Sequence, residues 1–175
     1  MKNILFIDLA TKSGFAVYNE ESQKIVKFGS VKFKGSCHGS KLDSCREWLD
    51  RITTEFNAAV VIVEDVYIPL DKERKSTSAF KLLSEYHGIV ELFCWDCSLE
   101  YGVIEASAHH QSLLGWQSKK WARKQIKEET MKRAKVMGYD VCSDDEADAI
   151  SLVRYWCHRY KKPLIAPNGH TYERS

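Results

Sequence analysis

The sequence predicts an α/β fold with a mixed sheet of five strands: an antiparallel three-strand meander plus two parallel strands, flanked by helices. Residues 3–9, 15–19 and 25–33 have the apolar runs or the alternation of strands, and short polar stretches join them, which indicates a meander. A continuous β-branched run at 60–63 is typical of a central strand covered on both faces. Helical and strand-like segments then alternate, which favours helices on both sides of the sheet.

The remaining elements follow in chain order. We expect a helix over 41–57, the strand at 60–63, a long helix over 79–93, a strand over 101–105, a short helix over 107–114, a basic helix over 121–137 and a last helix from about 143 to 160. Gly138 ends the basic helix, and Ser143 and Glu146 fit a capping box that starts the last one. The tail after Lys161 is expected to be frayed, so we predict one domain over 1–162 and a tail over 163–175.

Length and composition fit one folded domain. The chain has 175 residues, 44% apolar and 29% charged, which excludes a disordered protein and leaves little room for two domains around a cleft. Its longest apolar run, 58–63, is far shorter than the roughly 18–20 residues that span a bilayer. No signal peptide is expected at the N-terminus. We therefore expect no membrane association and a cytoplasmic location.

Charge is unevenly distributed, although the net charge is only +2. Residues 119–135 contain eight Lys or Arg against two Glu, and further basic clusters lie around 72–81 and 154–162. A compact acidic group occupies 144–148. Basic surfaces around a small acidic centre suit a protein that holds a polyanion and places metal ions on it. Solvated helix faces are the alternative interpretation.

The six cysteines predict free thiols rather than disulfides, because nothing in the sequence indicates secretion. Cys94 and Cys97 have the spacing of zinc ligands, but no second pair accompanies them. A zinc site would need Cys142, Cys157 or His158 from distant parts of the chain.

Four carboxylates have positions that suggest a metal centre. Asp8 and Glu64 each follow an apolar strand run, and neighbouring parallel strands would place both at one edge of the sheet. Asp145 and Asp148 are three residues apart and share a helix face, while Asp144 and Asp148 are an alternative pair. Hydrolysis of a phosphodiester needs an activated water and relief of negative charge, which two divalent ions held by carboxylates supply.

Several segments in the right order resemble the RuvC family of Holliday-junction resolvases, in the RNase H-like nuclease superfamily. The resemblance covers about residues 3–160. It is carried by the stretches 7–14, 61–67, 78–82, 122–127 and 145–150, of which the last resembles the family's D-x-x-D-A-hydrophobic terminus. The sequence departs from the family at Ala10, where glycine is usual, and in its cysteine and tryptophan content. A divergent, viral or phage-type branch fits these departures.

The resemblance implies roles for particular residues. Asp8, Glu64, Asp145 and Asp148 would be the catalytic set and would hold two Mg²⁺ (or Mn²⁺) ions. Tyr67 matches the aromatic residue that the family inserts at the branch point of the junction. The further residues expected to bind DNA are Arg74, Lys75, Lys81, Lys119, Lys120, Arg123, Lys124 and Lys127.

The implied activity is a metal-dependent endodeoxyribonuclease that resolves four-way junctions by paired symmetric cuts, in a bacterial cell or a phage-infected host. The family works as a homodimer, and the helix near 78–95 is apolar over more than one face, which favours a second subunit there. Three alternatives stay open: a nuclease with relaxed selectivity for branched or flapped DNA, an inactive DNA-binding module, and an actin-like or sugar-kinase-like phosphotransferase.

Overall fold

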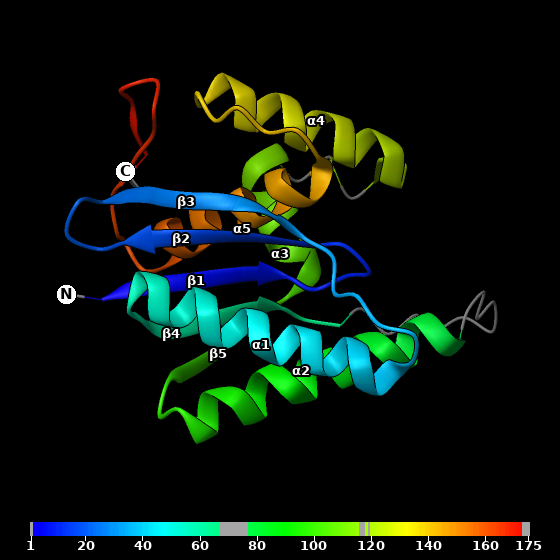
Figure 1. Ribbon diagram of the computed structural model, residues 1–175. Coiled ribbons are helices and arrows are strands. Elements are labelled where there is room, and N and C mark those ends of the chain that lie inside the picture. Colours follow the sequence, from blue (N-terminus) through cyan, green and yellow to red (C-terminus); the bar gives the residue numbers. More distant parts are fainter. Residues whose placement is uncertain (1, 67–76, 116–117, 119, 173–175) are drawn as a thin grey trace.

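The described part of the chain is organised around a mixed sheet of five strands in a computed structural model (Figure 1). The structure describes residues 2–66, 77–115, 118 and 120–172. The strands are β1 (Asn3–Asp8), β2 (Ser13–Asn19), β3 (Lys24–Val31), β4 (Ala58–Glu64) and β5 (Glu100–Ile104). They lie in the order β3-β2-β1-β4-β5, with an antiparallel meander of β1 to β3 and with β4 and β5 parallel to β1. The predicted fold class is confirmed.

Helices cover both faces of this sheet (Figure 1). They are α1 (His38–Phe56), α2 (Thr77–Asp96), α3 (Ala106–Leu114), α4 (Arg123–Val136) and α5 (Asp144–Arg159). Helices α1 and α2 lie on one face, and α5 lies on the other with α3 and α4 beside it. None of the helices in the described segments is long and apolar enough to span a bilayer.

The two faces of β1 and β4 are both apolar because both are covered. Ile4 and Phe6 join the core beneath α5, whereas Leu5 and Ile7 join the core beneath α1 and α2. β4 alternates in the same way between the two cores. Strands buried on both sides lack a polar face, which explains the uninterrupted apolar run at 60–63.

Local capping contacts set the helix ends near the site. The Ser143 hydroxyl accepts a hydrogen bond from the Glu146 backbone N–H at 3.4 Å, and the Glu146 carboxylate accepts one from the Cys142 N–H at 2.8 Å. α5 therefore begins where the sequence predicts. Gly138, with a φ of +92°, follows the end of α4 as expected. α1 begins three residues earlier than expected, because the Ser40 hydroxyl accepts a hydrogen bond from the Cys37 N–H at 3.1 Å.

The segment after Lys161 forms an ordered hairpin, so the expectation of a frayed tail is wrong for residues 162–172. β6 (Leu164–Ile165) pairs with β7 (Thr171–Tyr172). Leu164 is fully buried in the core beneath α5. The Tyr18 hydroxyl donates to the Pro163 carbonyl oxygen at 2.6 Å, which fastens the hairpin to the sheet. Burial of these apolar side chains outweighs the fraying common at chain ends.

Candidate metal centre

Two carboxylates lie together where two neighbouring strands end. β1 and β4 are parallel, and Ile7 lies opposite Val63, so Asp8 and Glu64 follow at adjacent positions on one edge of the sheet. Burial raises the pKa of Asp8 well above its usual range, and a hydrogen bond with Glu64 and its charge add to the shift. Burial also raises the pKa of Glu64, against the hydrogen bond from Asp8. The pair therefore keeps a proton more readily than exposed carboxyl groups do.

The start of α5 adds two more carboxylates to this edge. The charges of Asp148 and Asp145 both raise the pKa of Asp8, which means that the three groups interact. Asp148 is 8% exposed, and the side chain of Asp145 is 18% exposed. The structure thus brings together the four predicted carboxylates, which we call the carboxylate cluster: Asp8, Glu64, Asp145 and Asp148. Their role as metal ligands stays a prediction.

A close contact between β2 and α5 fixes the position of Asp145. Gly14 lies opposite Asp8 in the sheet, and a Cβ atom at Gly14 would overlap the backbone carbonyl group of Asp145. The helix can approach the strand only because residue 14 has no side chain. The buried Ser13 hydroxyl closes the preceding turn by donating to the Ala10 carbonyl oxygen at 3.1 Å.

Two lysines pair with the acidic start of α5. Lys12 Nζ lies 3.2 Å from Asp145 Oδ2 at the edge of the cluster. Lys127 of α4 donates to Asp144, and this hydrogen bond lowers the pKa of Asp144. Asp144 therefore ties α5 to α4, and Asp145 rather than Asp144 acts on Asp8. The alternative pair of Asp144 and Asp148 does not form at the cluster.

Sequence reasoning missed two histidines of α3 that contact the carboxylate cluster. His109 is fully buried, with Nε2 2.9 Å from Glu64 Oε1 and Nδ1 3.1 Å from the Ser151 hydroxyl of α5. Burial lowers the pKa of His109 to about 3, and the neighbouring His110 contributes to this shift. The neutral ring therefore links Glu64, at the end of β4, to the helix that carries Asp145 and Asp148.

His110 has a different environment from its neighbour. Its Nε2 lies 2.9 Å from Asp148 Oδ1, and its side chain is 21% exposed. Burial lowers the pKa of His110, but the hydrogen bond and charge of Asp148, with the charge of Glu64, raise it above the usual value. The two imidazole rings lie 3.9 Å apart between centroids. The sequence places this His-His pair four residues after the predicted strand 101–105, near the expected edge of the sheet, but nothing local indicates its contacts with Glu64 and Asp148.

The donor set of this site fits divalent cations. Carboxylate oxygens are hard ligands. The raised pKa values of Asp8 and Glu64 show that negative charge is unfavourable at this site, and a bound cation would offset that cost. One ligand atom from each of Glu64, His109 and His110 lies within 4.8 Å of the others. No comparable group that includes a cysteine occurs in the described residues, so the zinc site considered from Cys94 and Cys97 does not form there.

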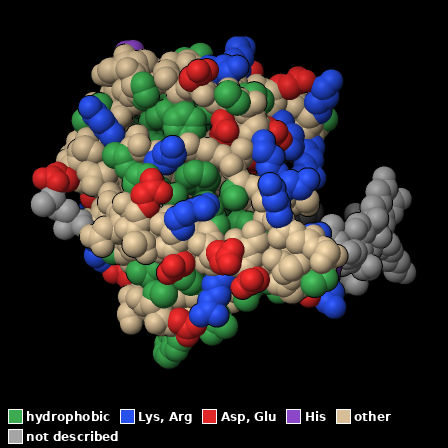
Figure 2. Space-filling model, viewed as in Figure 1, with side chains coloured by type: hydrophobic (Ala, Val, Ile, Leu, Met, Phe, Trp, Pro, Cys, Tyr) green, Lys and Arg blue, Asp and Glu red, His purple; other side chains and the backbone are tan. Residues whose placement is uncertain are grey.

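The predicted DNA-binding residues divide into those that the structure describes and those outside it. Tyr67, Arg74, Lys75 and Lys119 lie outside the described residues. The exposed or half-buried basic side chains that are described are Lys81 on α2 and Lys120, Arg123, Lys124 and Lys127 on or just before α4. Figure 2 shows Lys and Arg side chains gathered where α4 begins. The positive charge of Arg123 interacts with Glu64 and opposes the rise in the pKa of that carboxyl group. The basic surface therefore borders the carboxylate cluster.

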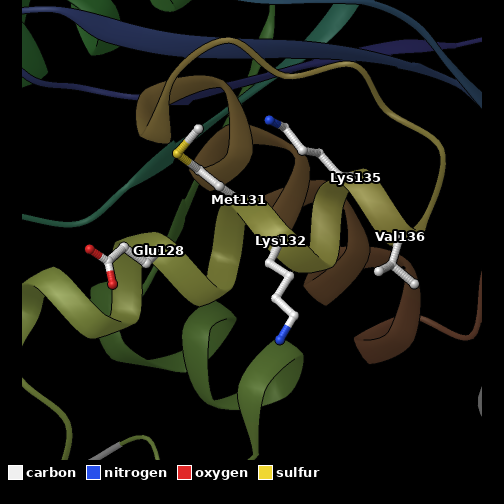
Figure 3. A pocket seen from close by; sticks show the side chains of 5 residues that line it. All are labelled: Glu128, Met131, Lys132, Lys135 and Val136. Carbon is white, nitrogen blue, oxygen red and sulfur yellow. The ribbon is translucent and has the colours of Figure 1, made fainter.

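Two hollows of the described surface lie apart from this cluster. One, of about 530 Å³, runs along α4 and is lined by Glu128, Met131, Lys132, Lys135 and Val136 (Figure 3). The Lys132 and Lys135 side chains point to different sides of the helix (Figure 3). The other, of about 240 Å³, lies between β5 and the end of α5. Neither hollow is lined by a residue of the carboxylate cluster.

The order of the strands and the placement of the helices define the RNase H-like fold, in the form seen in RuvC. RuvC of Thermus thermophilus in complex with a Holliday-junction substrate superposes with a TM-score of 0.65 at 16% identity, over 93% of this chain and 99% of that one. Thermus thermophilus RuvC alone gives 0.63 at 16% identity. The yeast mitochondrial Holliday-junction resolvase Ydc2 gives 0.52 at 14% identity, over 89% of this chain and 77% of that one. No protein-family model and no curated protein sequence matches this chain.

Proposed function

We propose that this protein is a metal-dependent, structure-selective endodeoxyribonuclease that resolves four-way DNA junctions by paired symmetric cuts. The observation that carries the proposal is the convergence of Asp8, Glu64, Asp145 and Asp148 at one edge of a RuvC-like sheet. We assign the activity to the single domain predicted over residues 1–162, together with the hairpin of β6 and β7 that packs on it. Thermus thermophilus RuvC, in complex with a Holliday-junction substrate, and the yeast mitochondrial Holliday-junction resolvase share this fold over most of the chain, which supports the same substrate.

The carboxylate cluster would hold two Mg²⁺ or Mn²⁺ ions. When bound, such ions activate a water and stabilise the charge that develops on the phosphate. The chain contributes the positions of the ligands: parallel strands align Asp8 with Glu64, and α5 presents Asp145 and Asp148 to them. Lys12, 3.2 Å from Asp145, limits the negative charge of the cluster.

The basic residues at the start of α4 would hold the DNA backbone beside the cluster. Arg123 is exposed, and Lys124 is 88% exposed along its side chain with only a surface ion pair to Glu128 at 3.7 Å, so both can turn toward phosphates. Lys127 contributes less in this proposal, because it is already paired with Asp144. Tyr67 would stack at the branch point, three residues after the end of β4.

We infer a two-fold homodimer, because two strands of a junction must be cut. Helix α2 carries exposed apolar side chains at Phe80 (40%), Leu92 (53%) and Trp95 (83%), while its opposite face is buried against the sheet. The spacing places these three residues on one side of the helix with the exposed Gly88 between them. The exposed Lys81 and Glu91 share this side of the helix, so the apolar contact is limited to these three residues, and we infer that they pack against a second subunit.

The cytoplasm stays our expected location, in a bacterial cell or a phage-infected host. All six cysteines are free thiols, which fits a reducing compartment.

The deciding experiment compares labelled DNA substrates with the full chain in Mg²⁺ and in Mn²⁺. We expect symmetric paired nicks in a four-way junction, little cutting of linear duplex, and no cutting by the Asp8→Asn variant. Equal cutting of forks, flaps and junctions would replace the resolvase by a nuclease of relaxed selectivity. ATP turnover without DNA cleavage would support a phosphotransferase instead, and junction binding without either activity would indicate an inactive binding module.

A further inference from the structure

His110 lies at the metal centre, but the carboxylate mechanism gives it no task. Its Nε2 is 2.9 Å from Asp148 Oδ1, and its nearest ring neighbour is His109. Both histidines have a carboxylate oxygen 2.9 Å from Nε2, so the difference between them lies in burial and in the second ring nitrogen. His109 is fully buried, and its Nδ1 is also bonded to Ser151, whereas the His110 side chain is 21% exposed, which makes His110 the better placed of the two to meet an ion.

We propose that His110 is a ligand of one of the bound metal ions, together with Asp148 and Glu64, and that it makes this position favour Mn²⁺ over Mg²⁺. This inference rests on the proposed function and specifies the chemistry of its metal site.

The distances support direct coordination. Neighbouring ligands of an octahedral ion with bonds of about 2.1 Å lie about 3 Å apart. His110 Nε2 and Asp148 Oδ1 are separated by 2.9 Å, so both could bind one ion with little movement. Ligand atoms of His110 and Glu64 lie within 4.8 Å of each other, as two ligands of the same ion do. The His109 ring, tilted by 37° with its centroid 3.9 Å away, packs against the His110 ring, whose Nε2 faces Asp148.

A nitrogen ligand changes the selectivity of such a site. Mg²⁺ prefers oxygen ligands, whereas imidazole nitrogen suits transition-metal ions better. The removal of His110 should therefore weaken Mn²⁺ binding more than Mg²⁺ binding. A carboxylate cluster without the histidine would discriminate less between the two ions.

The test uses Mn²⁺ itself as a spectroscopic probe of the full chain. Electron spin echo measurements on the Mn²⁺-loaded protein should show modulation from a directly bound ¹⁴N nucleus, and histidine labelled with ¹⁵N should change it. The modulation should vanish in His110→Ala and persist in His158→Ala, which removes an exposed histidine at the far end of α5. Titration followed by electron paramagnetic resonance should show about tenfold weaker Mn²⁺ binding in His110→Ala, with a smaller loss for competing Mg²⁺.

The outcomes separate this inference from the proposed function. If Mn²⁺ binds and Asp8→Asn removes it, but no nitrogen modulation appears or His110→Ala keeps it, the inference is wrong and the carboxylate centre survives. If Mn²⁺ does not bind to the cluster at all, both fail. Should His110→Ala not fold, His110→Gln and the ¹⁵N-labelled wild type decide the question in the same way.

Discussion

At the scale of a single residue, the Asp8 carboxylate has two opposing effects. It offers oxygen atoms that could bind a cation, but its negative charge destabilises the folded protein because it is buried. It lies among three other carboxylates, and burial together with Glu64 raises its pKa. Such a group costs free energy whenever it is ionised without a partner. A bound divalent ion would remove this cost, so stability and metal binding are coupled through Asp8.

Asp8→Asn is therefore expected to stabilise the metal-free protein. Because the folded pKa of Asp8 lies above its usual value of 3.8, the folded state binds more protons than the unfolded state between these two values, and stability falls as pH rises through that window. The asparagine cannot ionise, so the variant should melt higher than wild type at neutral pH in a chelator, with the difference shrinking in acid. A gain of about 1 kcal/mol corresponds to roughly 2–4 °C for a chain of this size.

Calorimetry with and without Mg²⁺ checks this prediction. The wild type should gain stability from the ion, and the variant should not. A variant that melts lower than wild type at neutral pH in the chelator would contradict the account of Asp8.

Ser151→Ala tests whether the chain of contacts from Ser151 through His109 holds Glu64 in place. The substitution leaves the buried Nδ1 of His109 without its partner, 3.1 Å away, which should cost about 1–3 kcal/mol in unfolding free energy. Outer contacts of this kind also tune metal affinity, so Mn²⁺ binding should weaken by about tenfold or more. Chemical denaturation and Mn²⁺ titration measure the two effects. Ser107→Ala on the same helix, at an exposed position, is the control that should change neither.

At the scale of elements, the contact of β2 with α5 positions half of the carboxylate cluster. Gly14→Ala would place a methyl group in the backbone of Asp145, so α5 has to move away from the sheet. We expect a loss of stability of more than about 2 kcal/mol and loss of cleavage even where the variant folds. Gly39→Ala in α1, where the added atom meets only Cys37 Sγ at 3.9 Å, should leave both unchanged. Equal activity of the two variants would show that the contact is unimportant.

Helix α4 provides the second prediction at this scale, namely the salt dependence of DNA binding. Replacing Arg123 and Lys124 by glutamine should weaken binding to every DNA shape and lower the slope of log affinity against log salt by roughly 0.9 for each lost phosphate contact. Neutral variants of Lys24 and Arg51, which are exposed on other elements, are the controls. An unchanged slope in the α4 variant would mean that this surface is only solvated.

The sequence predicts elements better than it predicts contacts between them. Apolar periodicity is enough to locate the strands and helices within a few residues, because each segment packs against the same two cores. The histidines of α3 escaped prediction, since nothing local shows that His109 meets Glu64, which is brought close by the pairing of β4 with β5. The hairpin of β6 and β7 escaped for the same reason: Leu164 is buried by partners far away in the chain.

At the scale of the whole molecule, the proposed homodimer can be tested by substitutions on the exposed side of α2. A glutamate at Leu92 or Trp95 should convert the dimer to a monomer, because it would bury a charge in the subunit interface. Sedimentation of the purified chain measures this, and paired nicking of a junction should decay to single nicks in the same variants. Val136→Glu, at a 65% exposed apolar position on α4, is the matched control and should stay dimeric. A monomeric wild type, with and without junction DNA, would refute the assembly.

The late position of α5 in the chain has a consequence for synthesis of the protein. β1 to β3 leave the ribosome first, yet the face that carries Phe6 and Tyr18 stays uncovered until α5 follows more than a hundred residues later. The same helix completes the carboxylate cluster. Under the proposed function, a nascent chain that lacks α5 would be unable to nick DNA, while its uncovered apolar face makes it a client for chaperones. Covering the sheet and completing the carboxylate cluster become one event, which waits for the synthesis of α5.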